Sequence, residues 1–304
     1  INLFMFKPIM DGFQVLEALR DSPEYKNIRI IILTVVDEIE KEVKGLSMGA
    51  VDFIRKPVNF ESLRIRIDIH FKLKSLQNKI EQDNRELEAI VSRKTQKLVV
   101  TRNITIQALV GLLEIRNIEA HNHIMRTQKI MKVLCEHLKN KDKYKTILTD
   151  DYISEIVDTA PLHDIGKVGI PDNILLKPDR LTEDEFEVMK NHVDYGVQAL
   201  KDELYSSETV PSFIKTAMEV IGTHHEKYDG TGYPSGLRGD CIPLPGRLMA
   251  IIDVYDALIS RRVYKPAYGY AYTIEYIESE SGKHFDPGVV AGFLEIRDRI
   301  FEIS

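Results

Sequence analysis

Residues 161–167 read Pro161-Leu162-His163-Asp164-Ile165-Gly166-Lys167, an apolar stretch broken by an adjacent histidine and aspartate. Such a pair offers an imidazole nitrogen and a carboxylate oxygen to the same metal ion, and both are common ligands of Zn, Mn and Fe. The chain has nine histidines, and five of them join three acidic residues in a candidate ligand set. We predict a multi-metal hydrolase site from this set: Glu119, His123, His163, Asp164, His192, His224, His225 and Asp253.

Length and composition limit the class of protein. The chain has 304 residues, 43% of them hydrophobic, which is enough for two domains, or one large one, with buried cores. A net charge of -6 argues against a broad surface for a nucleic-acid polymer, although a local basic cluster can still bind a small anion. The two cysteines lack metal-ligand spacing and give weak evidence for a disulfide, so we expect a reducing, cytoplasmic location.

The apolar runs and the start of the chain give three further expectations. No apolar run approaches ~20 residues, so we expect no transmembrane segment. The first residues do not resemble a signal peptide. The chain opens with Ile1 instead of Met, which suggests a fragment of a longer protein.

Residues 1–60 have the pattern of an α/β segment. Short β-branched runs at 30–33 and 51–54 predict two buried parallel strands, with a helix at 38–46 between them. The segment resembles the second half of a response-regulator receiver domain. The motifs that carry this resemblance are Pro8-Ile9-Met10-Asp11-Gly12, Leu33-Thr34, Gly49-Ala50 and Lys56-Pro57.

Two departures from the receiver pattern concern phosphorylation. The phosphoacceptor Asp of that family lies four residues before the first proline, and Phe4 stands at this position here. The first strand, with its acidic metal-binding pair, is absent as well. Either the receiver is degenerate or the chain lacks residues near its start. As written, it cannot be phosphorylated in the usual way.

Residues 61–100 carry a heptad-like stripe without glycine or proline. Apolar residues recur at alternating three- and four-residue steps, interrupted once by Asp83, and charged residues lie between them. We favour a coiled-coil linker helix that forms a homodimer and transmits a receiver signal. A single amphipathic helix packed on its own domain is the alternative. The stripe consists of Leu73, Leu76, Ile80, Leu87 and Ile90.

From residue 101 to 304 the apolar residues recur with the helical period, and prolines separate the helices. The predicted fold class is therefore mainly α. It comprises an all-helical domain after a partial α/β receiver-like domain and a long linker helix. The predicted helices span 104–114, 124–138, 153–160, 183–193, 212–223, 248–260 and 272–279.

Each candidate ligand has an ordinary explanation when it is taken alone. Glu119 and His123, four residues apart, share one helix face, but such pairs are common on surfaces. A lone buried His-Asp pair is often structural, and His192 in a polar helix could simply be solvated. Asp253 lies in an apolar run, where a buried carboxylate needs a counter-charge or a metal. We favour metal binding because it explains all of these residues together.

Two long motifs are similar to those of the HD-GYP family, HD-domain phosphohydrolases that degrade cyclic di-GMP. One is the 163–167 stretch, and further matches lie at 236–243, 253–258 and 284–287. The similarity covers about residues 101–295. A receiver joined to such a domain by a helix is a familiar arrangement in bacterial signalling proteins. The longer motif reads His224-His225-Glu226-Lys227-Tyr228-Asp229-Gly230-Thr231-Gly232-Tyr233-Pro234.

The resemblance implies roles for individual residues. Asp164 would bridge two metal ions, and Glu119 with His123 would add a third. Tyr233 lies in the signature loop beside the site. The remaining metal ligands would be His163, His192, His224, His225 and Asp253, and the phosphate-binding residues would be Lys167, Arg262 and Lys265.

The same resemblance bears on the ions. Ligation by histidine and carboxylate without thiolates suits Fe or Mn, with Zn less favoured, and we prefer iron by family resemblance. Ala120-His121 stands where relatives often have Thr-Gly. We expect His121 to be a neighbour of the site and not a ligand.

The implied activity is hydrolysis of cyclic di-GMP to pGpG, and a third ion would allow further cleavage to GMP. Asp164 and Lys167 are the predicted catalytic residues, because metals activate water and Lys167 can stabilise a phosphate or leaving oxygen. Two alternatives stay open. One is an HD phosphohydrolase of another nucleotide, and the other is a weakly catalytic cyclic di-GMP sensor that acts through signalling protein partners.

Overall fold

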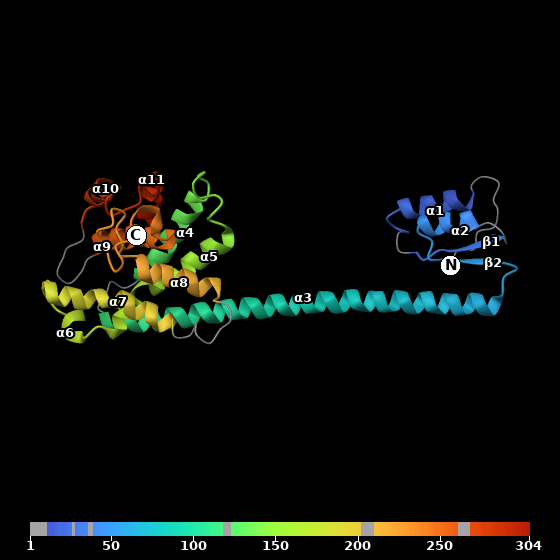
Figure 1. Ribbon diagram of the computed structural model, residues 1–304, viewed down its shortest axis with the longest axis horizontal. Coiled ribbons are helices and arrows are strands. Elements are labelled where there is room, and N and C mark those ends of the chain that lie inside the picture. Colours follow the sequence, from blue (N-terminus) through green and yellow to red (C-terminus); the bar gives the residue numbers. More distant parts are fainter. Residues whose placement is uncertain (1–10, 26–27, 36–38, 118–122, 202–209, 261–267) are drawn as a thin grey trace. The chain divides into compact units, whose positions relative to one another are not determined.

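The computed structural model describes residues 11–25, 28–35, 39–117, 123–201, 210–260 and 268–304 (Figure 1). The chain divides into two compact units, Ile1–Gln96 and Lys97–Ser304. One helix, α3 (Phe60–Asn117), contributes residues to both. Among the described residues, no helix is both long and apolar enough to span a bilayer.

Two strands form a parallel sheet among the described residues of the N-terminal unit. Strand β1 (Ile31–Val35) pairs with β2 (Asp52–Lys56), with Ile31 opposite Asp52 and Val35 opposite Lys56. Parallel strands need a crossover connection, and α2 (Ile39–Ser47) supplies it. The two predicted strands and the helix between them are confirmed, with ends one or two residues later than expected.

Helix α1 (Gly12–Asp21) begins at the receiver-like motif, where no helix was predicted. The Asp11 carboxylate accepts hydrogen bonds from the backbone N–H groups of Phe13 and Gln14, both at 2.9 Å. The Gln14 side chain in turn accepts a bond from the Asp11 backbone N–H. This capping box satisfies free donors of the first turn, so the start of α1 is encoded locally.

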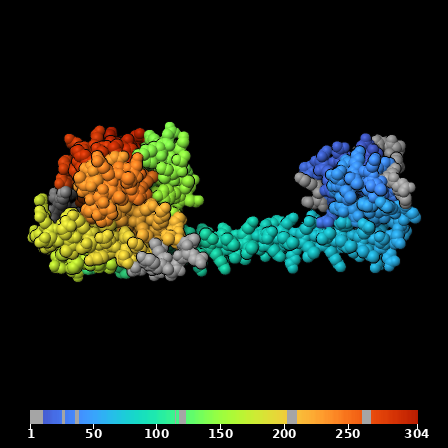
Figure 2. All heavy atoms as spheres, in the orientation of Figure 1, coloured from blue at the N-terminus to red at the C-terminus, as the bar shows by residue number. Residues whose placement is uncertain are grey.

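Helix α3 spans 58 residues, and its middle part carries exposed side chains from residue 75 to 101 (Figure 2). The five apolar residues of the predicted stripe are exposed and do not belong to the core cluster of the described residues of their unit. Their exposed fractions run from 46% for Leu73 to 60% for Leu87. Dimerisation through this stripe stays a prediction.

The same helix passes the predicted domain boundary at residue 100 without a break. The sequence suggested a separate helix at 104–114, but α3 continues through it to Asn117. The physical reason is the absence of proline between residues 60 and 117, with Gly111 the only glycine. The C-terminal part of α3 belongs to the second unit, where Ile106 and Val110 are buried against Ile124 and Ile221.

Helices and connecting loops make up the described residues of the C-terminal unit, which contain no strand and one isolated bridge between Ser281 and Phe285. The mainly α fold class is confirmed, and all seven predicted helices of this unit coincide with observed ones, the first inside α3. The α-helices after α3 are α4 (His123–Leu138), α5 (Asp150–Thr159), α6 (Asp172–Leu175), α7 (Glu183–Lys201), α8 (Ser212–Thr223), α9 (Leu244–Ile259), α10 (Tyr270–Ser279), α11 (Pro287–Glu295) and α12 (Arg297–Ile303).

Helix α9 lies at the centre of this unit. Eleven of its sixteen residues are buried, as expected for a helix that is apolar on most of its faces. Leu248 and Ile252 of α9 share one core cluster with Leu134 of α4 and Phe293 of α11. The core therefore fixes α4 and α9 together, and both helices carry predicted metal ligands.

Candidate metal centre

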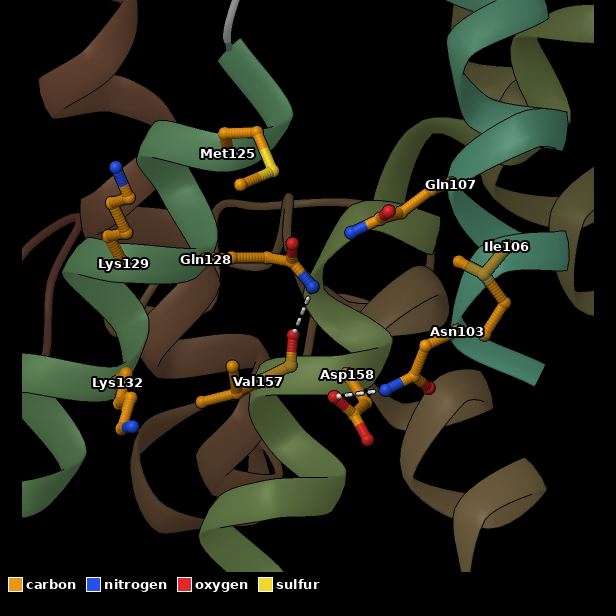
Figure 3. Close-up of a pocket in the computed structure, with 9 residues that line it drawn as sticks. All are labelled: Asn103, Ile106, Gln107, Met125, Gln128, Lys129, Lys132, Val157 and Asp158. Atoms are coloured by element: carbon orange, nitrogen blue, oxygen red, sulfur yellow. Dashed lines mark hydrogen bonds between the residues drawn. The ribbon is translucent and has the colours of Figure 1, made fainter. Parts of the chain in front are cut away.

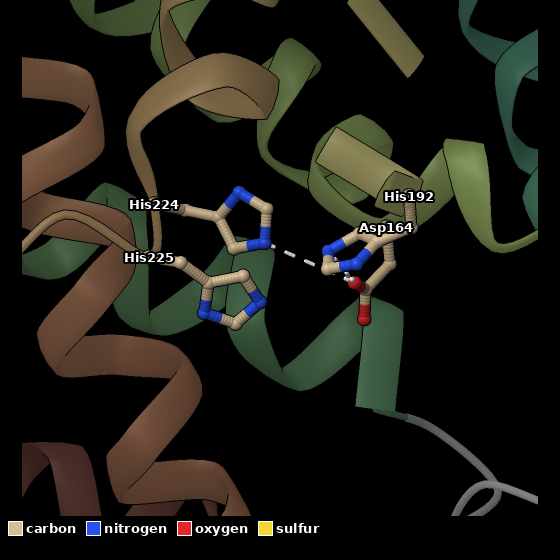
Figure 4. Close-up of side chains that lie close together, drawn as sticks. All are labelled: Asp164, His192, His224 and His225. Carbon is tan, nitrogen blue, oxygen red and sulfur yellow. Dashed lines mark ion pairs between the residues drawn. The ribbon is translucent and has the colours of Figure 1, made fainter. Parts of the chain in front are cut away.

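Seven of the eight predicted ligands converge inside the C-terminal unit, in two groups. Within each group, one ligand atom per residue lies within 4.8 Å of the others. Cluster one consists of Asp164, His192, His224 and His225 (Figure 4). Cluster two consists of His123, His163 and Asp253.

Asp164 lies where the two clusters meet. Its Oδ1 atom is 3.4 Å from Nε2 of His192 and 3.9 Å from Nε2 of His224. Its Oδ2 atom is 3.2 Å from Nε2 of His163, which itself lies 4.0 Å from Oδ1 of Asp253. The carboxylate can therefore be reached from both clusters, a position suited to a bridging ligand.

A 3-10 helix, η1 (Ala160–Gly169), brings His163 and Asp164 against α7. Gly166 makes this approach possible. A Cβ atom at Gly166 would lie 1.8 Å from the carbonyl oxygen of His192 and 2.6 Å from the backbone nitrogen of Gly196. No side chain fits this contact, so the glycine sets the distance between Asp164 and His192.

Three buried imidazoles are oriented in the same way, each with its Nδ1 atom against a backbone carbonyl oxygen. The Nδ1 atom of His163 lies 2.9 Å from the Ala160 carbonyl, that of His192 lies 2.7 Å from Met189, and that of His224 lies 2.9 Å from Ile221. Their Nε2 atoms, and that of His123, are buried without a hydrogen-bond partner among the described residues.

These unpartnered nitrogens test whether the residues fit a metal. A buried polar atom without a partner is costly, and four of them in one site need a common explanation. An imidazole whose Nδ1 donates to a carbonyl presents its Nε2 lone pair, which is the arrangement of a metal-bound histidine. The donor set of imidazoles and carboxylates therefore fits divalent ions.

Burial and neighbouring charges set the protonation of the site. Burial lowers the pKa of His224 to about 4 and also lowers the pKa of His192 and His225. Burial opposes ionisation of Asp164, but Lys167 and His163 hold its pKa well below the usual range. Neutral imidazoles beside an ionised carboxylate are the forms that bind cations.

His163 differs from these histidines. Burial acts to lower its pKa, but the Asp164 carboxylate outweighs burial and raises the pKa to about 9. A proton on His163 would partly neutralise the Asp164 carboxylate, whose Oδ2 atom lies 3.2 Å from Nε2 of His163. Because a proton and a metal ion compete for the same nitrogen, a bound cation would replace it.

Asp256 supports the site and was not predicted. Its Oδ2 atom lies 2.6 Å from Nδ1 of His123, while the Arg126 guanidinium and Ser260 also contact its carboxylate. This buried residue orients His123 in the way that carboxylates orient metal-bound histidines. The sequence feature that could have identified Asp256 is the spacing Asp253-Val254-Tyr255-Asp256. It puts two acids on neighbouring positions of one apolar helix face.

Glu226 is a second residue that was not assigned a role. It is 1% exposed, and its carboxylate accepts hydrogen bonds from the backbone N–H groups of Ser235 at 2.8 Å and Leu237 at 3.0 Å. It therefore closes the loop that carries Tyr233. The position of Glu226 directly after His224-His225 could have suggested a role at the site. Its backbone partners lie nine and eleven residues further along the chain, so the sequence did not indicate that it closes this loop.

The structure places two more predicted residues beside cluster one. The Tyr233 ring stacks on His225, with centroids 4.7 Å apart. The Lys167 ammonium lies 2.6 Å from Oδ2 of Asp164. Arg262, Lys265, Glu119 and His121 lie outside the described residues.

A separate cavity of about 260 Å³ lies between α3, α4 and α5 (Figure 3). Gln128 donates a hydrogen bond to the Val157 carbonyl, and Asn103 donates to Asp158. Its nine lining residues include no histidine and no cysteine, so this cavity has no ligand set of the kind found in the two clusters.

Two family models match the chain. The HD domain matches residues 112–289, and the response regulator receiver domain matches residues 5–68. The first match contains all seven residues of the two clusters. The second contains both strands of the N-terminal unit.

Curated relatives cover much or all of the chain. A probable cyclic di-GMP phosphodiesterase of Vibrio cholerae is 42% identical over 100% of this chain and 69% of its own length. The cyclic di-GMP phosphodiesterase response regulator RpfG of Xanthomonas campestris is 33% identical over 97% of this chain and 75% of its own length. A 3′3′-cGAMP-specific phosphodiesterase 2 of Vibrio cholerae is 37% identical over 64% of this chain and 35% of its own length.

Proposed function

The chain belongs to the HD-GYP family of cyclic di-GMP phosphodiesterases with a receiver domain, and we propose that it hydrolyses cyclic di-GMP to linear pGpG. The observation that carries the proposal is the convergence of seven ligand side chains with four buried, unpartnered Nε2 atoms. Bound divalent ions would supply Lewis-acid stabilisation of the phosphoryl transition state and would activate water.

The chain's own residues have distinct tasks in this proposal. Asp164 would help to hold ions at both clusters, and the imidazoles of the two clusters would supply the other ligands in a buried setting. Lys167 now contacts Asp164, and from this position it can turn to a phosphate oxygen or to the departing 3′ oxygen. Arg262 and Lys265 are proposed to bind the second phosphate.

We propose iron as the resident metal, with manganese as the alternative, because the donors are imidazoles and carboxylates. Cluster two could hold a third ion if Glu119 completes it. A third ion would favour rebinding of pGpG and its cleavage to GMP. Replacing Glu119 with Gln should then remove about one ion per chain and leave two.

The test begins with anaerobic purification and metal analysis, followed by incubation with cyclic di-GMP and chromatography of the products. Formation of pGpG by the metal-loaded wild-type chain is the expected result. The Asp164→Ala variant should lose both hydrolysis and bound metal. A loaded protein that leaves cyclic di-GMP intact would contradict the proposal and favour the sensor alternative.

A second substrate deserves a direct comparison. The similarity to a 3′3′-cGAMP-specific phosphodiesterase supports another cyclic dinucleotide as the alternative. Turnover of cyclic di-GMP and 3′3′-cGAMP should be measured in one competition assay. Faster cleavage of 3′3′-cGAMP would replace the first choice of substrate while keeping the metal chemistry.

Regulation is proposed to run through α3, which forms a homodimer by its exposed stripe. The C-terminal part of α3 has a direct connection to the site. Arg116 donates hydrogen bonds to the carbonyl oxygens of Val168 at 2.7 Å and Ile170 at 3.0 Å, just after Lys167. Light scattering that finds only monomers at working concentration would reject the dimer.

A further inference from the structure

A row of aromatic rings runs from cluster one towards solvent. His225 stacks on Tyr233 at an interplanar angle of 28°. Tyr233 then meets Phe186 of α7 edge to face, with centroids 6.2 Å apart and an angle of 82°. The Phe186 side chain is 44% exposed. The row therefore ends in a phenyl ring that water can reach, two ring contacts away from a metal ligand.

Lys190 lies one helical turn after Phe186 and on the same face of α7. Its ammonium is 5.1 Å from the centroid of Phe186 and 5.4 Å from that of Tyr233. An ion pair with Glu187 at 2.6 Å holds the side chain there, and it stays 28% exposed. A hydrogen-bond donor is thus held beside both rings.

We propose that Phe186 and Lys190, together with Tyr233, form a purine-binding platform that receives a guanine base whose phosphate lies at the metal centre. The inference rests on the proposed function, because it assigns base recognition to that same site. An exposed aromatic ring offers a stacking surface to any base. A lysine donor favours guanine, since guanine presents the O6 acceptor at the position where adenine presents its 6-amino group, while N7 is common to both bases.

The competing explanation is that Phe186 merely covers Tyr233. In that case, removal of the Phe186 ring would lower the affinity for all bound phosphates equally, because only the positions of Tyr233 and His225 would change. A base platform predicts a selective loss, limited to ligands that carry a base. The two explanations therefore predict different ratios between the affinity for a phosphate that carries a base and the affinity for one that does not.

The experiment measures this ratio by calorimetry on the full, manganese-loaded chain, with GMP and ribose 5-phosphate as probes. Both probes carry one phosphate on the same sugar position, and only GMP has a base. The wild-type chain should bind GMP roughly tenfold more tightly. Phe186→Ala and Phe186→Leu should bring the ratio close to one, with metal content unchanged.

Tyr195→Ala is the matched control. Tyr195 is another aromatic residue of α7 with a nearly equal exposed fraction of 45%, and it has no ring contact with Tyr233. It should keep the wild-type ratio. An unchanged ratio in both Phe186 variants, or an equal loss of affinity for both probes, would overturn the platform.

Lys190 is tested through base preference, with AMP as the third probe. Lys190→Met should lose the preference for GMP over AMP, while Lys190→Arg, which keeps a charged donor, should retain it. Equal preference in the wild type and Lys190→Met would remove Lys190 from the proposal. These titrations do not need cyclic di-GMP cleavage, so a failed phosphodiesterase assay and a failed platform are separate results.

Discussion

The Nδ1 atom of His123 lies 2.6 Å from the Asp256 carboxylate, which leaves the opposite ring nitrogen of this buried histidine without a partner. One residue of α9 thus fixes the orientation of a ligand at the start of α4. The carboxylate holds the imidazole in the tautomer that can bind a cation, and it increases the electron density of the ring.

Asp256→Asn should weaken metal binding at cluster two by about 10- to 100-fold. The amide keeps the shape of the side chain but removes the charge that orients His123. Manganese titration with metal analysis after dialysis measures the effect. Asp158→Asn is the control, because Asp158 is an acid of the same unit that pairs with Arg102 away from the clusters. Wild-type affinity in Asp256→Asn would contradict the assigned role.

Gly166→Ala should lower the free energy of unfolding by about 3 kcal/mol and reduce metal content. The added methyl group would meet the His192 carbonyl at 1.8 Å, so η1 must move away from α7. Thermal denaturation and metal analysis measure the two effects. At Gly111, in α3, a Cβ atom would meet nothing within 4 Å, so Gly111→Ala should instead stabilise the chain by about 0.5–1 kcal/mol. Similar melting of both variants would refute the close contact.

Glu226→Gln should destabilise the chain by about 2 kcal/mol and reduce turnover. The amide can accept one of the two backbone hydrogen bonds, but its NH2 group then faces the other donor. The loop would open and Tyr233 would lose its place on His225. Glu136→Gln, at an exposed position of α4, should change stability by no more than about 0.5 kcal/mol. Denaturant unfolding of both variants decides the point.

His284 should make stability depend on pH in the acid range. Burial, with the nearby Lys227 ammonium, lowers its pKa in the folded chain to about 4. Between the ordinary pKa near 6.5 and this value, the unfolded chain binds a proton that the folded chain does not. The contribution of His284 to the free energy of unfolding is therefore complete above pH 6.5. It falls by on the order of 2 kcal/mol as the pH is lowered towards 4.

The matching experiment compares the wild-type chain with His284→Gln in denaturant unfolding between pH 7 and pH 4.5. Histidines at the metal centre also titrate, so the difference between the two slopes is the relevant quantity. The variant should lose less stability on acidification than the wild type. Equal slopes would show that His284 does not carry this dependence.

The sequence alone predicted both strands and most of the longer helices, and it named the seven residues that the fold brings together in two clusters. It missed α1, η1, α6, α11 and α12. Strands and helices followed from the period of the apolar residues, since burial of one face imposes that period. The end of α8 at Thr223, just before His224-His225, was predicted to the residue. The continuous α3 was missed because a domain boundary was placed where no helix-breaking residue stands.

Only the tertiary structure decided how the ligands divide into two clusters and which nitrogens are free to bind. His163 and His192 are 29 positions apart, and Asp256 is 133 positions from His123, so local spacing carries no information about their distances. The packing of α4, α7 and η1 around the core sets these distances. The orientation of His123, His163, His192 and His224 then follows from the carbonyl or carboxylate that each Nδ1 atom meets, which depends on the folded neighbours and not on the residue itself.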